Sequence, residues 1–333
     1  LSAMNSTASR RLRTIPLLVL AAVVVTAGSP LWLVLALVVD VARYASRRVP
    51  FMALRLLAFA FVYLWAEVIG LVAAGWVWAT ARGETSRRRT YRIQAAWATS
   101  LFRAVEAIFG LRFHADGIEC AAPGPIIVLA RHASLVDNLL PAAFITRPAG
   151  IRLRYVLKKE LLADPALDVV GNRLPNAFID RDGDSSGATR QIADLARGMG
   201  PHEGVLLFPE GTRFSPERRR RVMAVLEKRS PRLHGLADGL RSVMPPHTGG
   251  VLALLESCRA DIVVLAHRGL DGFARLADIW RGAMVGTNVD VRMWRIGAER
   301  IPDDRQGRVE WLFDLWHEID GWINLASAVE EPA

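Results

Sequence analysis

A histidine and an aspartate five residues apart have types and spacing that predict chemistry. His132 stands at the end of an apolar run, residues 126–130, and Asp137 follows it. On a regular helix five residues rotate the chain by about 500°, which would leave the two side chains about 140° apart. They meet only if His132 lies in a turn and Asp137 lies in the first turn of a following helix. The carboxylate then fixes the imidazole tautomer, and the other ring nitrogen can take a proton from a hydroxyl group.

Two further apolar runs end in residues suited to holding a phosphate group. Residues 205–208 lead into Gly211 and Arg213. Glycine lets the backbone approach a ligand closely, and a guanidinium can bind a phosphate through two parallel hydrogen bonds. A third run, 177–180, leads into Arg181. Because ligand sites of α/β sheets lie beyond the carboxyl ends of the strands, the three run ends predict one shared site.

The elements that position these residues follow from the pattern after residue 82. Short apolar runs typical of strands alternate with segments of helical periodicity. This alternation predicts an α/β fold with a layered mixed or parallel sheet flanked by helices. The expected strands are 126–130, 153–157, 177–180, 205–208, 261–266 and 289–294, and the expected helices are 93–109, 188–199, 250–258 and 305–323.

Two charge-poor stretches precede this part of the chain. Residues 14–39 carry no charge, and residues 56–81 carry only Glu67. As helices, each would reach about 39 Å, more than the hydrocarbon core of about 30 Å. The sequence therefore predicts a membrane region at 1–82, followed by a second domain at 83–333. Glu67 either marks a function within the membrane or faces a neighbouring helix.

The first stretch has several interpretations. Residues 28–30, Gly-Ser-Pro, predict either a kinked span or a re-entrant hairpin. A secretory signal peptide is the alternative, with basic residues at 10–13 and an apolar region at 15–25. The apolar run resumes at Leu31, which favours membrane segments over a cleaved leader.

Composition excludes several classes of protein. Of 333 residues, 52% are hydrophobic and 23% are charged, which excludes disorder. The net charge is +9, and no P-loop, dinucleotide-binding fingerprint or nucleic-acid module occurs. We therefore interpret the positive charge as facing a membrane. A basic cluster at 82–92 favours the cytoplasmic side for the second domain, although arginines at 43–48 weaken the asymmetry.

Other reactive residue types show no pattern of a site. Cys120 and Cys258 form no C-x-x-C pair, which argues against a disulfide framework and a thiolate zinc site. Ser134 lacks the G-x-S-x-G elbow of a serine hydrolase. Arginines 218–221 are typical of a solvated face or of contact with anionic lipid. Five histidines have no metal-ligand spacing and are interpreted as structural or exposed: His114, His202, His234, His267 and His317.

Together these residues form four motifs in order between residues 112 and 264. His132 and Asp137 form H-x-x-x-x-D, 178–181 read F-I-D-R, 208–213 read F-P-E-G-T-R, and 243–246 form a short apolar-proline segment. The set resembles the glycerolipid acyltransferase family, which contains the lysophosphatidate and glycerol-3-phosphate acyltransferases. The F-P-E-G-T-R hexapeptide is the most specific of the four, and the last segment is the loosest.

Two positions depart from the usual family pattern. Arg131 precedes the histidine where asparagine is common. The resemblance therefore implies an altered hold on the acceptor or the thioester, with the base itself retained. The fourth motif continues as P-P-H-T-G-G, with His247 in a basic position. That variant resembles the branch that acylates lysocardiolipin and lysophosphatidylglycerol, and it leaves the acceptor headgroup open.

The resemblance implies an O-acyltransferase domain at 83–333 that needs neither cofactor nor metal. His132 would deprotonate a glycerol hydroxyl, which attacks the thioester of acyl-CoA or acyl-carrier protein, and Asp137 would orient the imidazole. Backbone amides at a helix start would stabilise the oxyanion. The residues expected to bind the phosphorylated acceptor are Arg181, Glu210, Gly211, Thr212 and Arg213.

The expected protein is therefore a membrane enzyme, at the inner membrane with its catalytic domain facing the cytoplasm. Its expected partners are a lysophospholipid, an acyl donor and membrane lipids, and not nucleic acid. Lysophosphatidate is the first expectation for the acceptor. The alternatives are lysophosphatidylglycerol, lysocardiolipin or an amino-acid-based lysolipid, or a non-enzymatic lipid-binding protein on the same fold.

Overall fold

The computed structural model describes residues 7–180 and 185–327, which form two compact units. The first, called the helical unit, comprises Leu1–Arg112, Leu157–Arg181 and Ala277–Thr287. The second, called the sheet unit, comprises Phe113–Val156, Asp182–Leu276 and Asn288–Ala333. The predicted domain boundary at residue 82 stays a prediction.

Within the described residues, seven strands form one mixed sheet in the order β1-β7-β6-β2-β5-β3-β4. The strands are β1 (Arg112–Asp116), β2 (Ile126–Ala130), β3 (Arg152–Lys158), β4 (Ala177–Ile179), β5 (Glu203–Leu207), β6 (Asp261–Arg268) and β7 (Asn288–Ile296). Strand β2 pairs in parallel with β5 and with β6, and β3 pairs in parallel with β5. Strands β6 and β7 are antiparallel. The predicted α/β fold with a mixed sheet flanked by helices is confirmed.

Burial on both faces explains why the central strands could be predicted. Every residue of β2 and β5 is buried, and such strands read as continuous apolar runs. The six expected strands all occur, with ends shifted by no more than two residues. Strand β1 was not expected, because its residues alternate between exposed and half-buried and form no apolar run.

The helices of the sheet unit are short except for α12, which packs against β6, α9 and α10. Its buried face includes Leu312, Phe313 and Trp316, at the spacing of one helical stripe. The elements are η2 (Ile118–Ala121), η3 (Val136–Leu139), η4 (Ala142–Thr146), α5 (Arg147–Ala149), α7 (Ser185–Ala196), α8 (Pro216–Arg229), α9 (Pro231–Ala237), α10 (Thr248–Ser257), η6 (Ala298–Arg300) and α12 (Arg305–Ser327).

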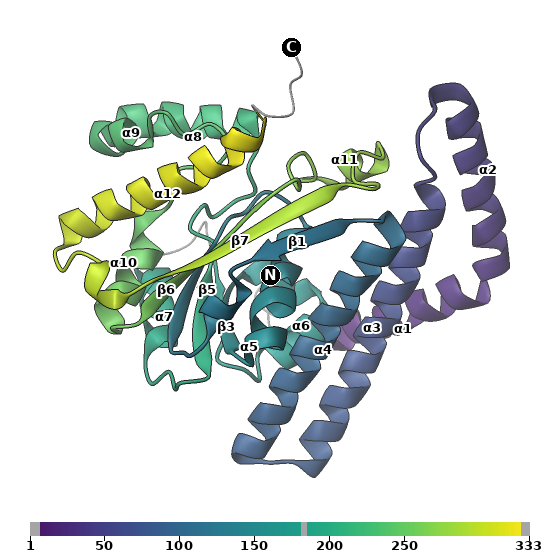
Figure 1. The fold of residues 1–333 in the computed structure, drawn as a ribbon. Coiled ribbons are helices and arrows are strands. Elements are labelled where there is room, and N and C mark those ends of the chain that lie inside the picture. The colour runs from purple at the N-terminus through teal and green to yellow at the C-terminus, as the bar shows by residue number, and fades with distance from the viewer. Residues whose placement is uncertain (1–6, 181–184, 328–333) are drawn as a thin grey trace. The chain divides into compact units, whose positions relative to one another are not determined.

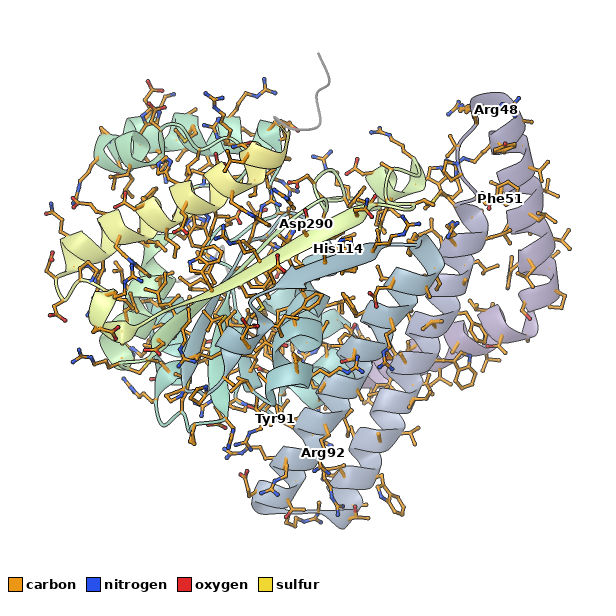
Figure 2. All side chains as sticks on the ribbon, viewed as in Figure 1. Arg48, Phe51, Tyr91, Arg92, His114 and Asp290 are labelled. Atoms are coloured by element: carbon orange, nitrogen blue, oxygen red, sulfur yellow. The ribbon has the colours of Figure 1, made fainter. Side chains whose placement is uncertain are left out.

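Helix α3 is the centre of the helical unit and packs against α1, α2, α4 and α6 (Figure 1). The helices of this unit are α1 (Thr7–Ala27), α2 (Ser29–Arg47), α3 (Ala53–Thr80), α4 (Gly83–Phe109), η5 (Lys159–Ala163) and α6 (Pro165–Gly171), with α11 (Leu276–Trp280) at its boundary. Asp40, on α2, accepts hydrogen bonds from the amides of Met52, Ala53 and Leu54, and so caps the start of α3. Arg48 and Phe51 lie in the connection that this cap closes (Figure 2).

The first charge-free stretch, residues 14–39, is divided between two helices. The chain leaves α1 after Ala27 and starts α2 at Ser29, with Pro30 in the first turn of α2. Proline suits that position because its missing N–H has no partner within the helix there. Helices α2 and α3 are the two described helices that are long and apolar enough to cross a membrane. The first candidate span therefore lies further along the chain than the sequence predicted.

Glu67 faces its neighbours within the helical unit. Its carboxylate accepts a hydrogen bond from the indole Nε1 of Trp97, on α4, at 2.8 Å, and another from the amide of Ala166, on α6, at 3.0 Å. The side chain is fully buried. Of the two interpretations of this residue, contact with a neighbouring helix is the one the structure supports.

Candidate active site

His132 lies in the turn that follows β2, and the turn after β5 holds it in place. Its amide donates a hydrogen bond to Oε1 of Glu210 at 2.7 Å, and its carbonyl accepts one from the amide of Phe214 at 2.8 Å. Its ring packs against Phe208, with 4.7 Å between ring centroids. The side chain remains 13% exposed, and Nε2 has no hydrogen-bond partner among the described residues. This nitrogen is therefore accessible to a substrate.

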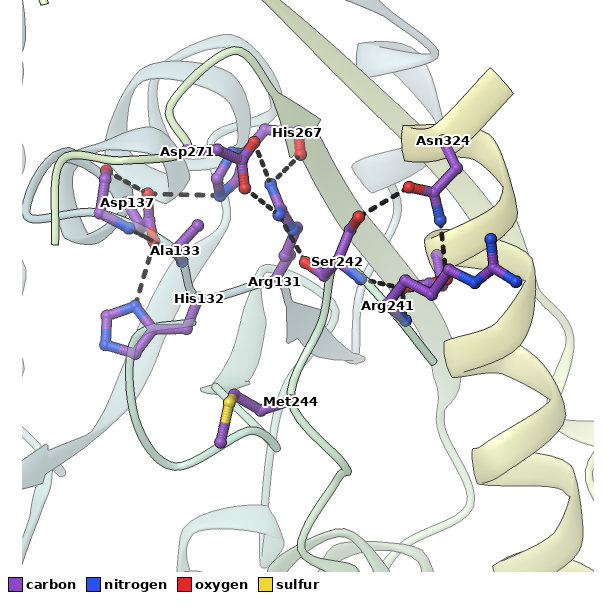
Figure 3. Close-up of polar contacts among 12 residues, drawn as sticks. Arg131, His132, Ala133, Asp137, Arg241, Ser242, Met244, His267, Asp271 and Asn324 are labelled. Atoms are coloured by element: carbon purple, nitrogen blue, oxygen red, sulfur yellow. Dashed lines mark hydrogen bonds and ion pairs between the residues drawn. The ribbon is translucent and has the colours of Figure 1, made fainter. Parts of the chain in front are cut away.

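Asp137 lies in η3, and its carboxylate meets the other nitrogen of the same ring. The distance from Nδ1 of His132 to Oδ2 of Asp137 is 3.1 Å (Figure 3). The histidine is in a turn and the aspartate is in the first turn of a short 3₁₀ helix. This is the arrangement that the five-residue spacing required.

The turn around Asp137 supplies most of its hydrogen bonds. Oδ2 accepts from the amides of Ala133 and Ser134 at 2.5 and 2.7 Å, and Oδ1 accepts from the Ser134 hydroxyl at 2.5 Å. Burial would raise the pKa of Asp137, but contacts with His267 and His132 outweigh it and hold the pKa well below its ordinary value. Asp137 is therefore an anion that is fixed in place. The amides of Ala133 and Ser134 are occupied by it, so they do not form the expected oxyanion hole.

A second histidine, His267, lies against the same carboxylate. It is at the end of β6, it is fully buried, and its Nε2 is 3.2 Å from Oδ1 of Asp137. The sequence pattern predicts a structural or exposed histidine here and gives it no part in the site. The signal that could have found it is its place at the end of the expected strand 261–266, since parallel strands end at the same edge of a sheet.

Glu210 is buried, and backbone amides occupy its carboxylate. Oε1 accepts from His132 and Oε2 accepts from the amide of Met244 at 2.8 Å. Burial raises the pKa of Glu210 to about 8, although Arg131 and the two amides act in the opposite direction. Glu210 was expected among the substrate-binding residues; the structure places its carboxylate between two chain segments, where it holds the backbone of His132.

Gly211 and Arg213 complete the turn after β5. Gly211 has φ of +65°, and a Cβ atom there would lie 2.8 Å from Cδ2 of His247, so both conformation and space require glycine. Arg213 is half-buried, and its guanidinium forms no ion pair with any residue that the structure describes. Burial and the neighbouring Arg218 lower its pKa, while Asp137 acts in the opposite direction. Thr212, between them, is also half-buried.

Arg131, which departs from the usual family pattern, forms an ion pair with Asp271. It is fully buried and bonds to the Asp271 carboxylate, to the carbonyl of His267 at 2.8 Å and to the carbonyl of Ser242 at 2.7 Å. Asp320, on α12, accepts hydrogen bonds from the amides of Arg241 and Ser242. Arg131 thus secures the 241–244 segment, and it does not face solvent, where an acceptor or a thioester would enter.

Arg181 lies outside the described residues, so its expected role in phosphate binding stays a prediction. Phe178 and Ile179, the two residues before Asp180, end β4 one residue before the predicted end of this strand. Among the described residues, no group of three or more His, Cys, Asp or Glu side chains could hold a metal ion. The expectation of a reaction without metal or cofactor also stays a prediction.

Comparisons with known proteins bear on the segment that carries these residues. Residues 112–267 match the family model described as Acyltransferase. The fold resembles the crystal structure of the 1-acyl-sn-glycerophosphate (LPA) acyltransferase PlsC from Thermotoga maritima, with a TM-score of 0.51 and 15% identity. That similarity covers 84% of this chain and 99% of the other. No curated protein matches the chain. Residues 112–267 therefore match the acyltransferase family model, and the chain shares its fold with the protein from Thermotoga maritima.

Proposed function

We propose that this protein is a membrane-associated O-acyltransferase that transfers a fatty acyl group to the free hydroxyl of a lysophospholipid, with lysophosphatidate as the first candidate. The observation that carries the proposal is the contact between His132 and Asp137, within the segment that matches the acyltransferase family. The similar protein from Thermotoga maritima is an LPA acyltransferase, which supports the choice of acceptor.

His132 is the proposed general base. Its accessible Nε2 takes the proton of the acceptor hydroxyl as the oxygen attacks the thioester carbonyl carbon. The tetrahedral intermediate then expels the thiolate, which takes the proton from His132. Asp137, bonded to Nδ1, fixes the tautomer and stabilises the imidazolium that forms between the two steps.

The turn after β5 is the proposed binding site for the acceptor phosphate. Arg213 offers a half-buried guanidinium, and Gly211 and Thr212 bring the backbone close. Arg181 is the proposed second arginine. Glu210 supports the site from behind, because its carboxylate fixes the amide of His132.

The donor in this proposal is acyl-CoA or acyl-carrier protein, and the reaction needs no cofactor or metal. Lysophosphatidylglycerol, lysocardiolipin and an amino-acid-based lysolipid are alternative acceptors. The P-P-H-T-G-G segment supports the lysocardiolipin and lysophosphatidylglycerol branch, since His247 lies directly against Gly211 in the proposed phosphate turn.

Membrane association through α1, α2 and α3 is part of the proposal. Their exposed apolar side chains include Leu17, Leu20, Leu33, Val38, Ile69, Val72, Trp76 and Trp78. An apolar surface on this scale is typical of contact with lipid, and both substrate and product are lipids. The basic residues at 82–92 favour the cytoplasmic face. Recovery of the full-length protein in the supernatant of an alkaline carbonate wash would contradict integral attachment.

The deciding experiment supplies the purified full-length protein with labelled acyl-CoA or acyl-carrier protein and a panel of lysophospholipids. We expect labelled phosphatidate from lysophosphatidate. The matched control is His132→Ala, which should lower turnover by about 10²- to 10⁴-fold because it removes the general base. Equal turnover by this variant would disprove the assignment, and binding of lysolipid without transfer from either donor would favour the non-enzymatic alternative.

A further inference from the structure

The second imidazole at Asp137 has no part in the proposed reaction. His267 ends β6, which pairs in parallel with β2 in a register that aligns Ala130 with Leu265. His132 and His267 each follow this aligned pair by two residues, His132 in the turn after β2 and His267 within β6. Their rings approach different oxygens of one carboxylate, at 3.1 Å from His132 Nδ1 to Oδ2 and 3.2 Å from His267 Nε2 to Oδ1 (Figure 3).

The remaining contacts of Asp137 come from its own turn. The amides of Ala133 and Ser134 and the Ser134 hydroxyl belong to residues that precede Asp137 by three or four positions. These hydrogen bonds fix Asp137 relative to its own turn, but they do not fix it relative to the rest of the sheet. Among the described residues, His267 is the contact that ties the carboxylate to a different strand.

Packing alone does not explain an imidazole at this position. His267 is fully buried, and neither ring nitrogen has a well-aligned hydrogen-bond partner among the described residues. An apolar side chain of similar size would fill the space without leaving buried polar atoms unsatisfied. The nearby Arg131 is already paired with Asp271. The carboxylate of Asp137 is therefore the charged group that Nε2 faces.

We propose that His267 is a positioning residue for acyl transfer, whose Nε2–H holds the Asp137 carboxylate in the orientation that directs His132. The inference rests on the proposed function, in which Asp137 fixes the tautomer of His132. His267 does not touch the substrate. Without it, the carboxylate is free to turn about its Cβ–Cγ bond, and fewer molecules hold the His132 proton on Nδ1 with Nε2 free to act as base.

The first test compares two substitutions of His267 in the full-length protein. His267→Leu keeps the volume and removes the donor, and we expect kcat to fall by about 10- to 100-fold with both substrate KM values unchanged. His267→Gln places an amide donor near the position of Nε2 and should recover most of the lost kcat. The matched control is His317→Gln, because His317 is a half-buried histidine of α12 that bonds to the carbonyl of Leu236 at 2.9 Å, away from Asp137. Its kcat should not change.

A double-mutant cycle separates positioning from general loss of structure. In an Asp137→Asn background, His267→Leu should have little further effect on kcat. The reason is that His267 acts on His132 through the Asp137 carboxylate, which this background lacks. A full additional loss in that background would overturn the inference. So would unchanged kcat in His267→Leu, or a glutamine variant no better than leucine. If the leucine variant does not fold, Asn replaces it, since its shorter amide cannot reach Oδ1, and equal kcat for Gln and Asn then overturns the inference.

A spectroscopic readout does not depend on transfer activity. Ring ¹⁵N chemical shifts of His132 report which nitrogen carries the proton. We expect Nδ1–H in the unaltered protein and in His317→Gln, and a mixture of tautomers in His267→Leu. An unchanged tautomer in His267→Leu rejects the positioning role even if the proposed function holds. Failure of the unaltered protein to acylate any lysophospholipid rejects the proposed function, and the tautomer result then decides the role of His267 separately.

Discussion

The turns after β2 and β5 each bury a carboxylate, but the two carboxylates have opposite electrostatic properties. Asp137 accepts hydrogen bonds from a hydroxyl and two amides and lies within 3.2 Å of two imidazole nitrogens, and its pKa lies well below the ordinary value. Glu210 receives two amides at a similar depth, and burial raises its pKa to about 8. Burial alone therefore does not determine the charge of an acid. The number and charge of the groups around the acid determine its charge as well. They make Asp137 suited to stabilising an imidazolium and Glu210 suited to holding the backbone in place.

The largest expected effect tests the anionic character of Asp137. Asp137→Asn keeps the size of the side chain but removes the charge that stabilises protonated His132. We expect kcat to fall by about 10³- to 10⁴-fold, as in related His–Asp pairs. Steady-state kinetics with saturating substrates measures this. A loss below about ten-fold would show that Asp137 is structural, like Glu210.

Arg213 should have the next largest effect, on the acceptor side of the reaction. Arg213→Ala removes a charged donor, so we expect catalytic efficiency toward lysophosphatidate to fall by about 10- to 100-fold. Arg213→Lys should recover little, because an ammonium cannot form two parallel bonds to a phosphate. Kinetics with each substrate varied in turn separates the two sides. A rise confined to the donor KM, or monoacylglycerol accepted as readily as lysophosphatidate, would contradict the phosphate role.

Gly211 tests how far the turn after β5 depends on its backbone. Gly211→Ala requires a left-handed conformation and places Cβ against His247, and we expect a loss of about 1–2 kcal/mol in the free energy of unfolding. Adding His247→Ala should relieve the contact but not the conformational strain, so it should restore only part of the stability. Denaturant unfolding in detergent measures both variants. Full recovery in the double variant would mean that the positive φ carries no strain.

The last prediction concerns the pH dependence of stability, whose effect is spread over several pH units. The pKa of Glu210 rises from 4.5 to about 8 on folding, so the folded protein holds this proton more tightly than the unfolded chain. Its stabilising contribution is complete below about pH 4.5 and declines as pH rises toward 8, by at most about 1.4 kcal/mol per pH unit. Asp137 acts in the opposite sense, because its contribution is lost as pH falls below about 3.8. Unfolding of Glu210→Gln between pH 5 and 8 should show a smaller slope, and parallel slopes would contradict the raised pKa.

Local patterns allowed much of the fold and part of the site to be predicted. Strand β2 has the predicted bounds because a strand buried on both faces is a continuous apolar run. The contact between His132 and Asp137 was expected on condition that His132 lies in a turn and Asp137 in the first turn of a following helix, as the structure shows. Both features depend on residues that are close in sequence, so local sequence patterns are enough to predict them.

The features that escaped prediction depend on distant pairing. The contact of His267 with Asp137 requires the register of β2 and β6, which no local pattern specifies. Glu210 could be recognised as important, but the two amides that occupy its carboxylate come from segments far apart in the chain. An interruption at residues 28–30 was expected, but the first candidate span was misplaced because α2 continues past the charge-free stretch through Asp40, Arg43 and Arg47.

Hydrogen bonds connect Asp320 to Ser242 and Met244 to Glu210, and so fix the position of the 241–244 segment. They limit which changes in the sequence of this segment the site can accept. An insertion or deletion between Ser242 and Met244 would shift the amide that Glu210 binds, and with it the backbone of His132. His247 lies beyond that anchor and against Gly211, in the turn proposed to bind the acceptor phosphate. We therefore expect changes of headgroup preference to arise by substitution at and after His247, while the length of the preceding segment stays fixed.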